Sequence, residues 1–190
     1  MNRLSAPHLT AALVALWLAS ACHTIELAAP ANPKVETPRS QTSASIVVEP
    51  SSRTLSYSFG GTSAGLANRF EVEVGETLMR YAEAYCARAF QSGSELQLEV
   101  EIESFTIAEG AGQLVTRFTV RRDGETIFAP HYMVEGPPRP ELPGSTGLTT
   151  GAGVAAEGST SVLRESLRRT LHDVLTLTLW TFFQELEAQL

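Results

Sequence analysis

A long segment with a two-residue alternation constrains the fold of this chain more than any other feature. Within residues 95–107, apolar side chains alternate with glutamate or glutamine as far as Ile102, which predicts a half-buried β-strand. The apolar positions then change phase and continue at Phe105. Because a one-residue slip would expose the core face, we expect a β-bulge near Ser104.

The next strand, at residues 114–122, is expected to return antiparallel to this one. If the bulge absorbs one residue, Glu103 lies opposite Arg117 and Glu99 lies opposite Arg121. The acidic stripe is therefore predicted to form ion pairs on a solvated face rather than a cation site. Such exposed pairs contribute only about 0–1 kcal/mol each.

Turn signals and shorter alternations complete the strands. Asp123-Gly124 is typical of a two-residue hairpin and leads to a third strand that ends near Phe128, before Pro130. Two earlier strands are predicted at residues 55–59 and 70–74.

Two helices are predicted. The first begins at Glu76, and its apolar stripe includes Cys86, which we interpret as a buried small hydrophobic residue rather than a reactive thiol. The second covers residues 162–190, with Ser161 as the N-cap. Residues 175–179 alternate as a strand would, but the length of the segment favours a helix.

This order of elements predicts the α+β class. Two helices would pack on one face of an antiparallel sheet of about four to five strands, giving a two-layer sandwich. We expect the folded domain to cover residues 54–190, with a flexible loop at 137–161 that is rich in proline and glycine. Residues 22–53 contain several prolines and are predicted to be a linker. The one short apolar run within this segment, Ser45–Glu49, indicates a first strand.

The N-terminus has the form of a secretion signal. Leu9–Leu18 is apolar but only about half as long as the ~20 residues of a transmembrane helix, and small residues follow it. Residues 1–21 are therefore predicted to be a signal peptide. Leu18-Ala19-Ser20-Ala21-Cys22 resembles the lipobox of bacterial lipoproteins, although that family prefers leucine where Ala19 stands.

The lipobox resemblance implies that Cys22 becomes the first mature residue and carries fatty acyl chains such as palmitate. The alternative to lipidation is cleavage of the same bond by ordinary signal peptidase, which would leave Cys22 free. His23 follows the cysteine where an aspartate would favour retention at the inner membrane. The resemblance therefore implies an outer-membrane lipoprotein facing the periplasm, with the inner membrane as the alternative.

Charge and composition exclude several other classes. The net charge is −7, and the basic residues form no cluster, so a nucleic-acid-binding function is not expected. Two cysteines and isolated histidines predict neither a disulfide scaffold nor a metal site, and no cofactor motif is present.

One enzymatic motif is a remote alternative. Gly61-Thr62-Ser63-Ala64-Gly65 matches the G-x-S-x-G pattern of serine hydrolases, with Asp123 and either His131 or His172 as the remaining triad residues. The motif would need a helix directly after Ser63, whereas the sequence predicts a strand.

The outward face of the C-terminal helix supplies the candidate interface. Leu177 and Trp180 lie among polar residues at helical spacing, with Phe183 at the border of the same face. We interpret these three residues as a docking surface for a partner protein or a second copy of the chain. Two alternatives stay open: the segment is a strand, or the long loop covers the patch.

The sequence as a whole favours a non-enzymatic cell-envelope lipoprotein, an accessory or assembly subunit of an envelope complex that is held to the membrane through Cys22. In general layout the body resembles the lipopolysaccharide-assembly lipoprotein and the auxiliary lipoproteins of ABC transporters. The alternative is a periplasmic binder of lipid or lipopolysaccharide, which would need an apolar cavity between the sheet and the helices.

Overall fold

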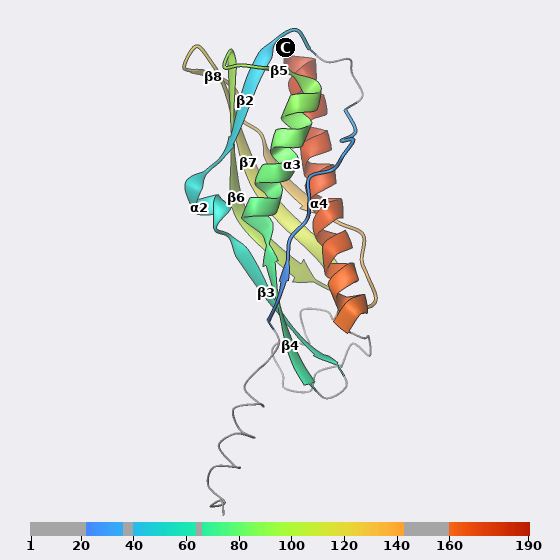
Figure 1. The fold of residues 1–190 in the computed structure, drawn as a ribbon. Helices are drawn as coiled ribbons and strands as arrows, with labels where there is room; N and C mark the ends of the chain where they lie inside the picture. Colours follow the sequence, from blue (N-terminus) through green and yellow to red (C-terminus); the bar gives the residue numbers. More distant parts are fainter. Residues whose placement is uncertain (1–21, 36–39, 64–65, 143–159) are drawn as a thin grey trace, which may run out of the picture.

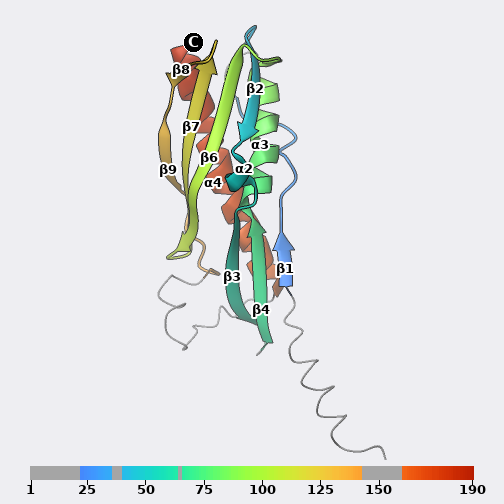
Figure 2. The same ribbon diagram turned by 90° about the vertical axis from the view of Figure 1, so that its left-hand side faces the viewer.

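Two long helices cover one face of a β-sheet (Figures 1 and 2). The computed structural model describes residues 22–35, 40–63, 66–142 and 160–190. The helices are α3 (Val74–Ala89) and α4 (Thr160–Gln189), which lie side by side. The α+β class and the packing of two helices on one face are therefore confirmed.

The larger sheet has six strands in the order β5-β2-β6-β7-β8, and β9 also pairs with β7. Strand β2 is parallel to β5 and β6, whereas the other pairs are antiparallel. The bounds of the strands are β2 Ser43–Val48, β5 Gln91–Ser92, β6 Leu96–Ala108, β7 Ala111–Arg122, β8 Glu125–Phe128 and β9 His131–Glu135.

A second sheet of three strands has the order β1-β4-β3. Its strands are β1 (Cys22–Ile25), β3 (Ser56–Ser63) and β4 (Leu66–Glu73). The first is parallel to β4, and β3 and β4 form an antiparallel hairpin. The short helix α2 (Pro50–Arg53) connects the two sheets, and the hairpin extends from one end of the molecule (Figure 2).

The sheets differ from the expected arrangement in two respects. They are mixed and separate, rather than one antiparallel sheet of four to five strands. The expected linker, residues 22–53, supplies β1 and α2 in addition to the indicated strand β2, and Ile25 and Leu27 are buried in the core. Parallel strands pair with distant segments, so their pairing leaves no local turn signal in the sequence.

The predicted bulge is present, but the predicted register of β6 and β7 is wrong by two residues. The register shifts between Ile102 and Ser104, and Glu101, rather than Glu103, is the partner of Arg117. The cause is a tight turn at Glu109 and Gly110, which both have positive φ, so that β7 already begins at Ala111.

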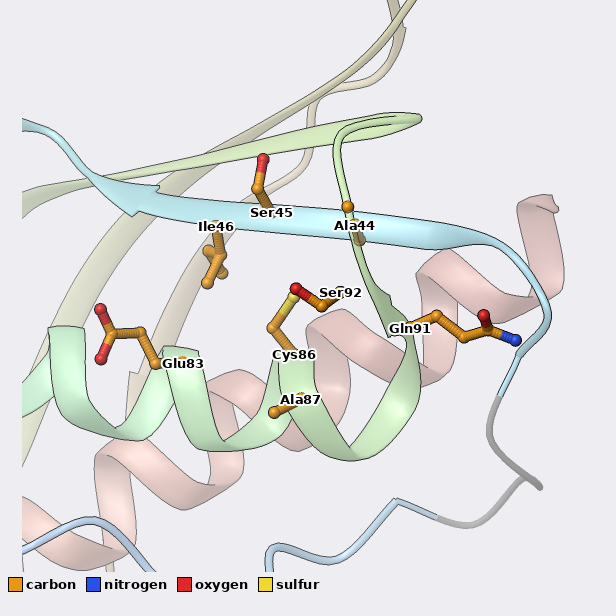
Figure 3. Close-up of a pocket in the computed structure, with 9 residues that line it drawn as sticks. Ala44, Ser45, Ile46, Glu83, Cys86, Ala87, Gln91 and Ser92 are labelled. Atoms are coloured by element: carbon orange, nitrogen blue, oxygen red, sulfur yellow. The ribbon is translucent and has the colours of Figure 1, made fainter.

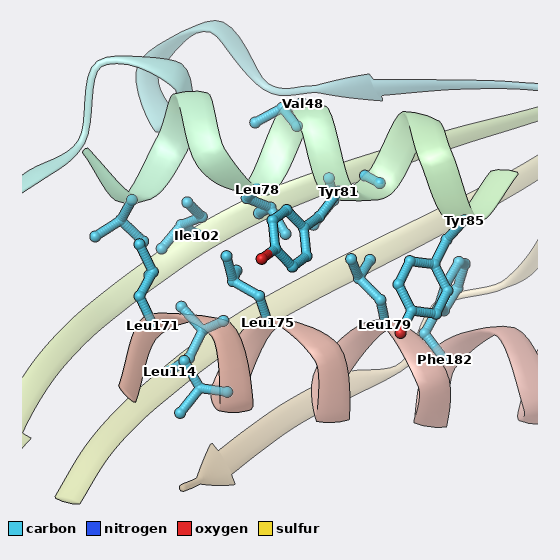
Figure 4. Close-up of a cluster of buried hydrophobic side chains, with 14 of the residues drawn as sticks. Val48, Leu78, Tyr81, Tyr85, Ile102, Leu114, Leu171, Leu175, Leu179 and Phe182 are labelled. Carbon is cyan, nitrogen blue, oxygen red and sulfur yellow. The ribbon is translucent and has the colours of Figure 1, made fainter. Parts of the chain in front are cut away.

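Side chains from both helices and the sheet fill the space between the two layers (Figure 4). The ring of Phe182 on α4 stacks on Phe118 of β7 with centroids 4.0 Å apart. Leu175 and Leu179 are fully buried, and the segment that alternates like a strand is helical throughout. Helical spacing thus places the apolar residues of α4 on the face that contacts the sheet.

The start of the expected flexible loop is packed onto the domain. Leu142 is buried, and the backbone N–H of Arg139 donates to the carbonyl oxygen of Gly110 at 3.0 Å. Most of the predicted loop 137–161, namely residues 143–159, lies outside the described residues.

Candidate functional site

The outward face of α4 presents part of the predicted interface. Leu177 is 42% exposed, and Trp180 is half-buried against the core. Phe183 is buried, and its ring stacks on Tyr85 of α3 at 5.8 Å, so it does not belong to this surface. At 100° per residue Phe183 lies at the border of the outward face. Because Tyr85 of α3 packs against this border, Phe183 belongs to the core.

Leu177 and Trp180 line an open groove of about 400 Å³, called the α4 groove below. Its other lining residues come from three places, namely the N-terminal segment, the end of β9 and the preceding turns of α4: Lys34, Gly136, Pro137, His172, Asp173 and Thr176. Segments far apart in the sequence therefore build one surface that is apolar at its centre and polar at its edges. Protein-binding surfaces commonly have this composition.

Two contacts hold the wall of the α4 groove in place. The guanidinium of Arg139 forms an ion pair with the carboxylate of Asp173, and both side chains are largely buried. The backbone N–H of Gly136 donates to the carbonyl oxygen of Gly112 at 2.8 Å. Because these contacts join residues 136–139 to β7 and α4, the groove is formed before any partner binds.

His172 lies at the edge of the α4 groove and joins the two helices. Its Nδ1 is 2.8 Å from the hydroxyl of Tyr81 on α3. It also lines a neighbouring depression of about 350 Å³ with Leu27, Pro30 and Arg168. His172 and the adjacent Asp173 bond to different residues, namely Tyr81 and Arg139.

A smaller pocket of about 240 Å³ is lined by residues of α3, β2 and the edge strand β5. Figure 3 shows Cys86 on α3 with its sulfur directed towards Ser92. Burial raises the pKa of the Cys86 thiol to about 11, so the thiolate needed for nucleophilic chemistry is scarce at neutral pH. The prediction of a buried, unreactive cysteine agrees with this position.

The acidic stripe of β6 forms ion pairs despite the wrong register. Arg117 Nη2 lies 2.6 Å from Glu103, and Arg121 Nη1 lies 2.8 Å from Glu99. His131 Nε2 is 2.9 Å from the second oxygen of Glu103, and this hydrogen bond lowers the pKa of that carboxyl group. Residues of β7 and β9 thus contact the carboxylates of the stripe.

The G-x-S-x-G segment does not have the geometry of a nucleophile elbow. Ser63 is the last residue of β3, and β4 begins at Leu66, so a strand follows where a hydrolase has a helix. Ala64 and Gly65 lie outside the described residues. Asp123 is in the turn between β7 and β8, at the opposite end of the molecule from the β3–β4 hairpin (Figure 1).

Cys22 begins β1 and is paired with Arg69 of β4. The folded domain therefore extends to the first residue of the expected mature chain. Among the described residues, no helix is long and apolar enough to cross a membrane, and no group of three or more histidine, cysteine or acidic side chains could hold a metal ion.

Comparison with known proteins supports the fold. No family model matches the chain, and no curated protein is significantly similar to it in sequence. The structure is similar to the crystal structure of protein XCC0632 from Xanthomonas campestris, which is described by the family model DUF330. The two chains are 10% identical with a TM-score of 0.52, and the match covers 89% of this chain and 99% of the other. At this identity the likeness shows a shared fold.

Proposed function

We propose that this chain is a non-enzymatic lipoprotein of the bacterial cell envelope, anchored through Cys22 to the periplasmic leaflet of the outer membrane. In this role the domain is an accessory or assembly subunit that docks a protein of the same envelope complex through the α4 groove. The observation that carries the proposal is the exposed Leu177 beside the half-buried Trp180 in a groove with a fixed wall.

The groove suits a protein segment better than a small molecule. It is open to solvent, so a drug-sized ligand would remain largely exposed in it, whereas small-molecule sites bury most of their ligand. A tryptophan and a leucine that are ringed by polar groups resemble the energetic centre of a protein interface. Truncation of such a centre typically lowers affinity by at least 2 kcal/mol, or about thirtyfold.

The experiment uses the full chain expressed with its own signal peptide and purified from membranes. Leu177→Gln should abolish co-purification of a stoichiometric protein partner while the melting temperature stays the same. Val162→Gln is the matched control, because Val162 lies on the same helix with the same exposure of 42%. Equal retention of the partner by both variants would refute the α4 groove as the docking site.

Two further readouts separate the remaining roles. Loss of a self-assembled species in Leu177→Gln, without any other protein, would identify a second copy of this chain as the partner. Co-purified lipid that persists in Leu177→Gln, without a protein partner, would favour the alternative role as a lipid binder. An unmodified Cys22 in the N-terminal peptide mass would refute the lipid anchor.

A further inference from the structure

The backbone of the expected anchor residue is fixed to the folded domain. Strand β1 begins at Cys22 and pairs with β4 from Cys22↔Arg69 to Ile25↔Val72. Ile25 is buried in the core, which holds the other end of this short strand in place. Acyl chains on Cys22 would therefore leave the domain from a defined position.

The β3–β4 hairpin extends past this position. Strand β4 begins at Leu66, three residues before Arg69, and at about 3.3 Å per residue this distance is roughly 10 Å. Because β1 and β4 are parallel, the extension lies on the side from which the chain enters β1. Figures 1 and 2 show the hairpin projecting beyond β1 at this end of the molecule.

The charge pattern changes at the same level. The sequence carries no charged residue from Thr54 to Asn68. The first charge on β4 is the exposed Arg69, the partner of Cys22, and Arg164 of α4 donates to Nδ1 of His23 at 2.8 Å. The guanidinium of Arg164 thus lies beside β1, whereas that of Arg69 donates to the hydroxyl of Ser58 on β3 at 3.1 Å. The part of the hairpin beyond Arg69 is uncharged.

From this arrangement we infer that the paired end of the hairpin, Gly61–Ser63 with Leu66–Asn68, inserts into the interfacial layer of the bilayer beside the acyl chains of Cys22. The inference rests on the proposed lipidation of Cys22. These six residues are called the hairpin tip below.

The dimensions and the chemistry of the interface favour this position. The polar layer of one leaflet is about 5–8 Å thick, comparable to the projection of roughly 10 Å. An uncharged tip avoids the cost of moving charges towards hydrocarbon, whereas arginines at the level of Cys22 can remain among the headgroup phosphates.

The backbone of the hairpin tip tolerates this layer. Gly61↔Asn68, Thr62↔Ala67 and Ser63↔Leu66 pair across the hairpin, so many of its N–H and C=O groups already have partners. Headgroups and interfacial water can bond to the outward-facing groups. Insertion would hold the domain upright, with the β7–β8 turn directed away from the membrane.

The experiment measures the depth of single fluorophores in the lipidated, full-length protein. Ser63→Cys places an environment-sensitive label at the hairpin tip, and Thr62→Cys is a second variant in case the first does not fold. Ser58→Cys lies five residues back along β3, about 17 Å away, and Asp123→Cys lies at the opposite end. All variants carry Cys86→Ala and are reconstituted into vesicles of phosphatidylethanolamine and phosphatidylglycerol that contain a nitroxide-labelled lipid.

We expect severalfold stronger quenching at Ser63→Cys than at Ser58→Cys, and none at Asp123→Cys. Equal quenching at Ser63→Cys and Ser58→Cys would show a domain lying flat and would overturn the inference. Absence of quenching at all positions, with an acylated Cys22 by mass and flotation with vesicles, would also overturn it and leave the anchor intact. A chain whose Cys22 is unmodified would instead refute the proposed function.

Discussion

The hydroxyl of Ser52 on α2 accepts a hydrogen bond from the backbone N–H of Ile102 on β6, at 2.8 Å. Ile102 is the last residue before the register shift in β6, and the Ser52 side chain is buried. The short helix between the two sheets thus supplies the partner for a backbone donor next to the bulge.

Replacement of Ser52 by alanine should leave that buried N–H without its partner. A donor left unsatisfied in this way costs about 1–3 kcal/mol. We expect Ser52→Ala to lower the free energy of unfolding by this amount in urea titrations. Ser51→Ala, at the neighbouring exposed serine, should have the smaller effect, and equal losses would contradict the role assigned to Ser52.

Gly75 allows α2 and the start of α3 to approach closely. A Cβ atom at this position would overlap the backbone oxygens of Ser52 and Arg53, whereas a Cβ at Gly60 would meet nothing within 4 Å. Overpacking against backbone typically costs about 1–3 kcal/mol or more. Gly75→Ala should therefore lower the melting temperature by several degrees, and Gly60→Ala should leave it nearly unchanged.

The hydrogen bond from His131, followed by the charges of His131 and Arg117, lowers the pKa of Glu103 below 4.5. The folded state therefore binds fewer protons at this carboxyl group than the unfolded state. The resulting stability is present above pH 4.5 and is lost as the pH falls through the lowered pKa.

Glu103→Gln should remove this pH-dependent contribution. The variant should be less stable than the wild type above pH 5, and the difference should shrink as the pH falls below 4. Urea titrations across this range measure the difference, with Glu83→Gln on α3 as the control for net charge. A difference that grows towards low pH would contradict the sign.

The alternation of apolar residues predicted β6 and β7 well because both strands have one buried and one solvated face. The ion pairs of Arg117 and Arg121 were also predicted with their partners, although the register was wrong by two residues. Long arginine side chains reach diagonal as well as direct cross-strand partners, so charge complementarity alone does not determine register.

The N-terminal strands were harder to predict for a different reason. Strand β1 has four residues and pairs with β4, which lies more than forty residues later in the sequence. A strand of four residues is too short to be recognised from its length or from alternating apolar residues. The proline-rich sequence around it favoured a linker. The short apolar run at Ser45–Glu49 did indicate β2.

The candidate interface could be predicted only in part, because helical spacing places residues on a face without showing what packs on its border. Leu177 and Trp180 follow the spacing, whereas Tyr85 of α3 covers Phe183. The groove beside Leu177 also needs Lys34 and Pro137, whose position depends on tertiary contacts such as the Arg139–Asp173 ion pair.

Cys86 should react slowly with thiol reagents in the folded protein. Burial raises the pKa of its thiol from 9.0 to about 11, so the thiolate fraction at pH 8 is about a hundredfold smaller. The modification rate with a soluble disulfide reagent should therefore rise at least a hundredfold when the domain is unfolded in urea. A folded-state rate close to the unfolded one would show that the pocket around Cys86 opens readily.

The contact between Tyr81 and His172 should couple α3 to α4. The tyrosine side chain is almost fully buried, and its hydroxyl meets Nδ1 of the exposed imidazole at 2.8 Å with the rings edge to face. A hydrogen bond of this kind contributes about 0.5–1.5 kcal/mol, and the lower end applies here because water can reach the imidazole. In a double-mutant cycle, Tyr81→Phe and His172→Ala should each destabilise the domain, and their combination should cost less than the sum of the two. Additive losses would show that the hydroxyl and the imidazole contribute independently, and the coupling of the two helices would then depend on their apolar contacts alone.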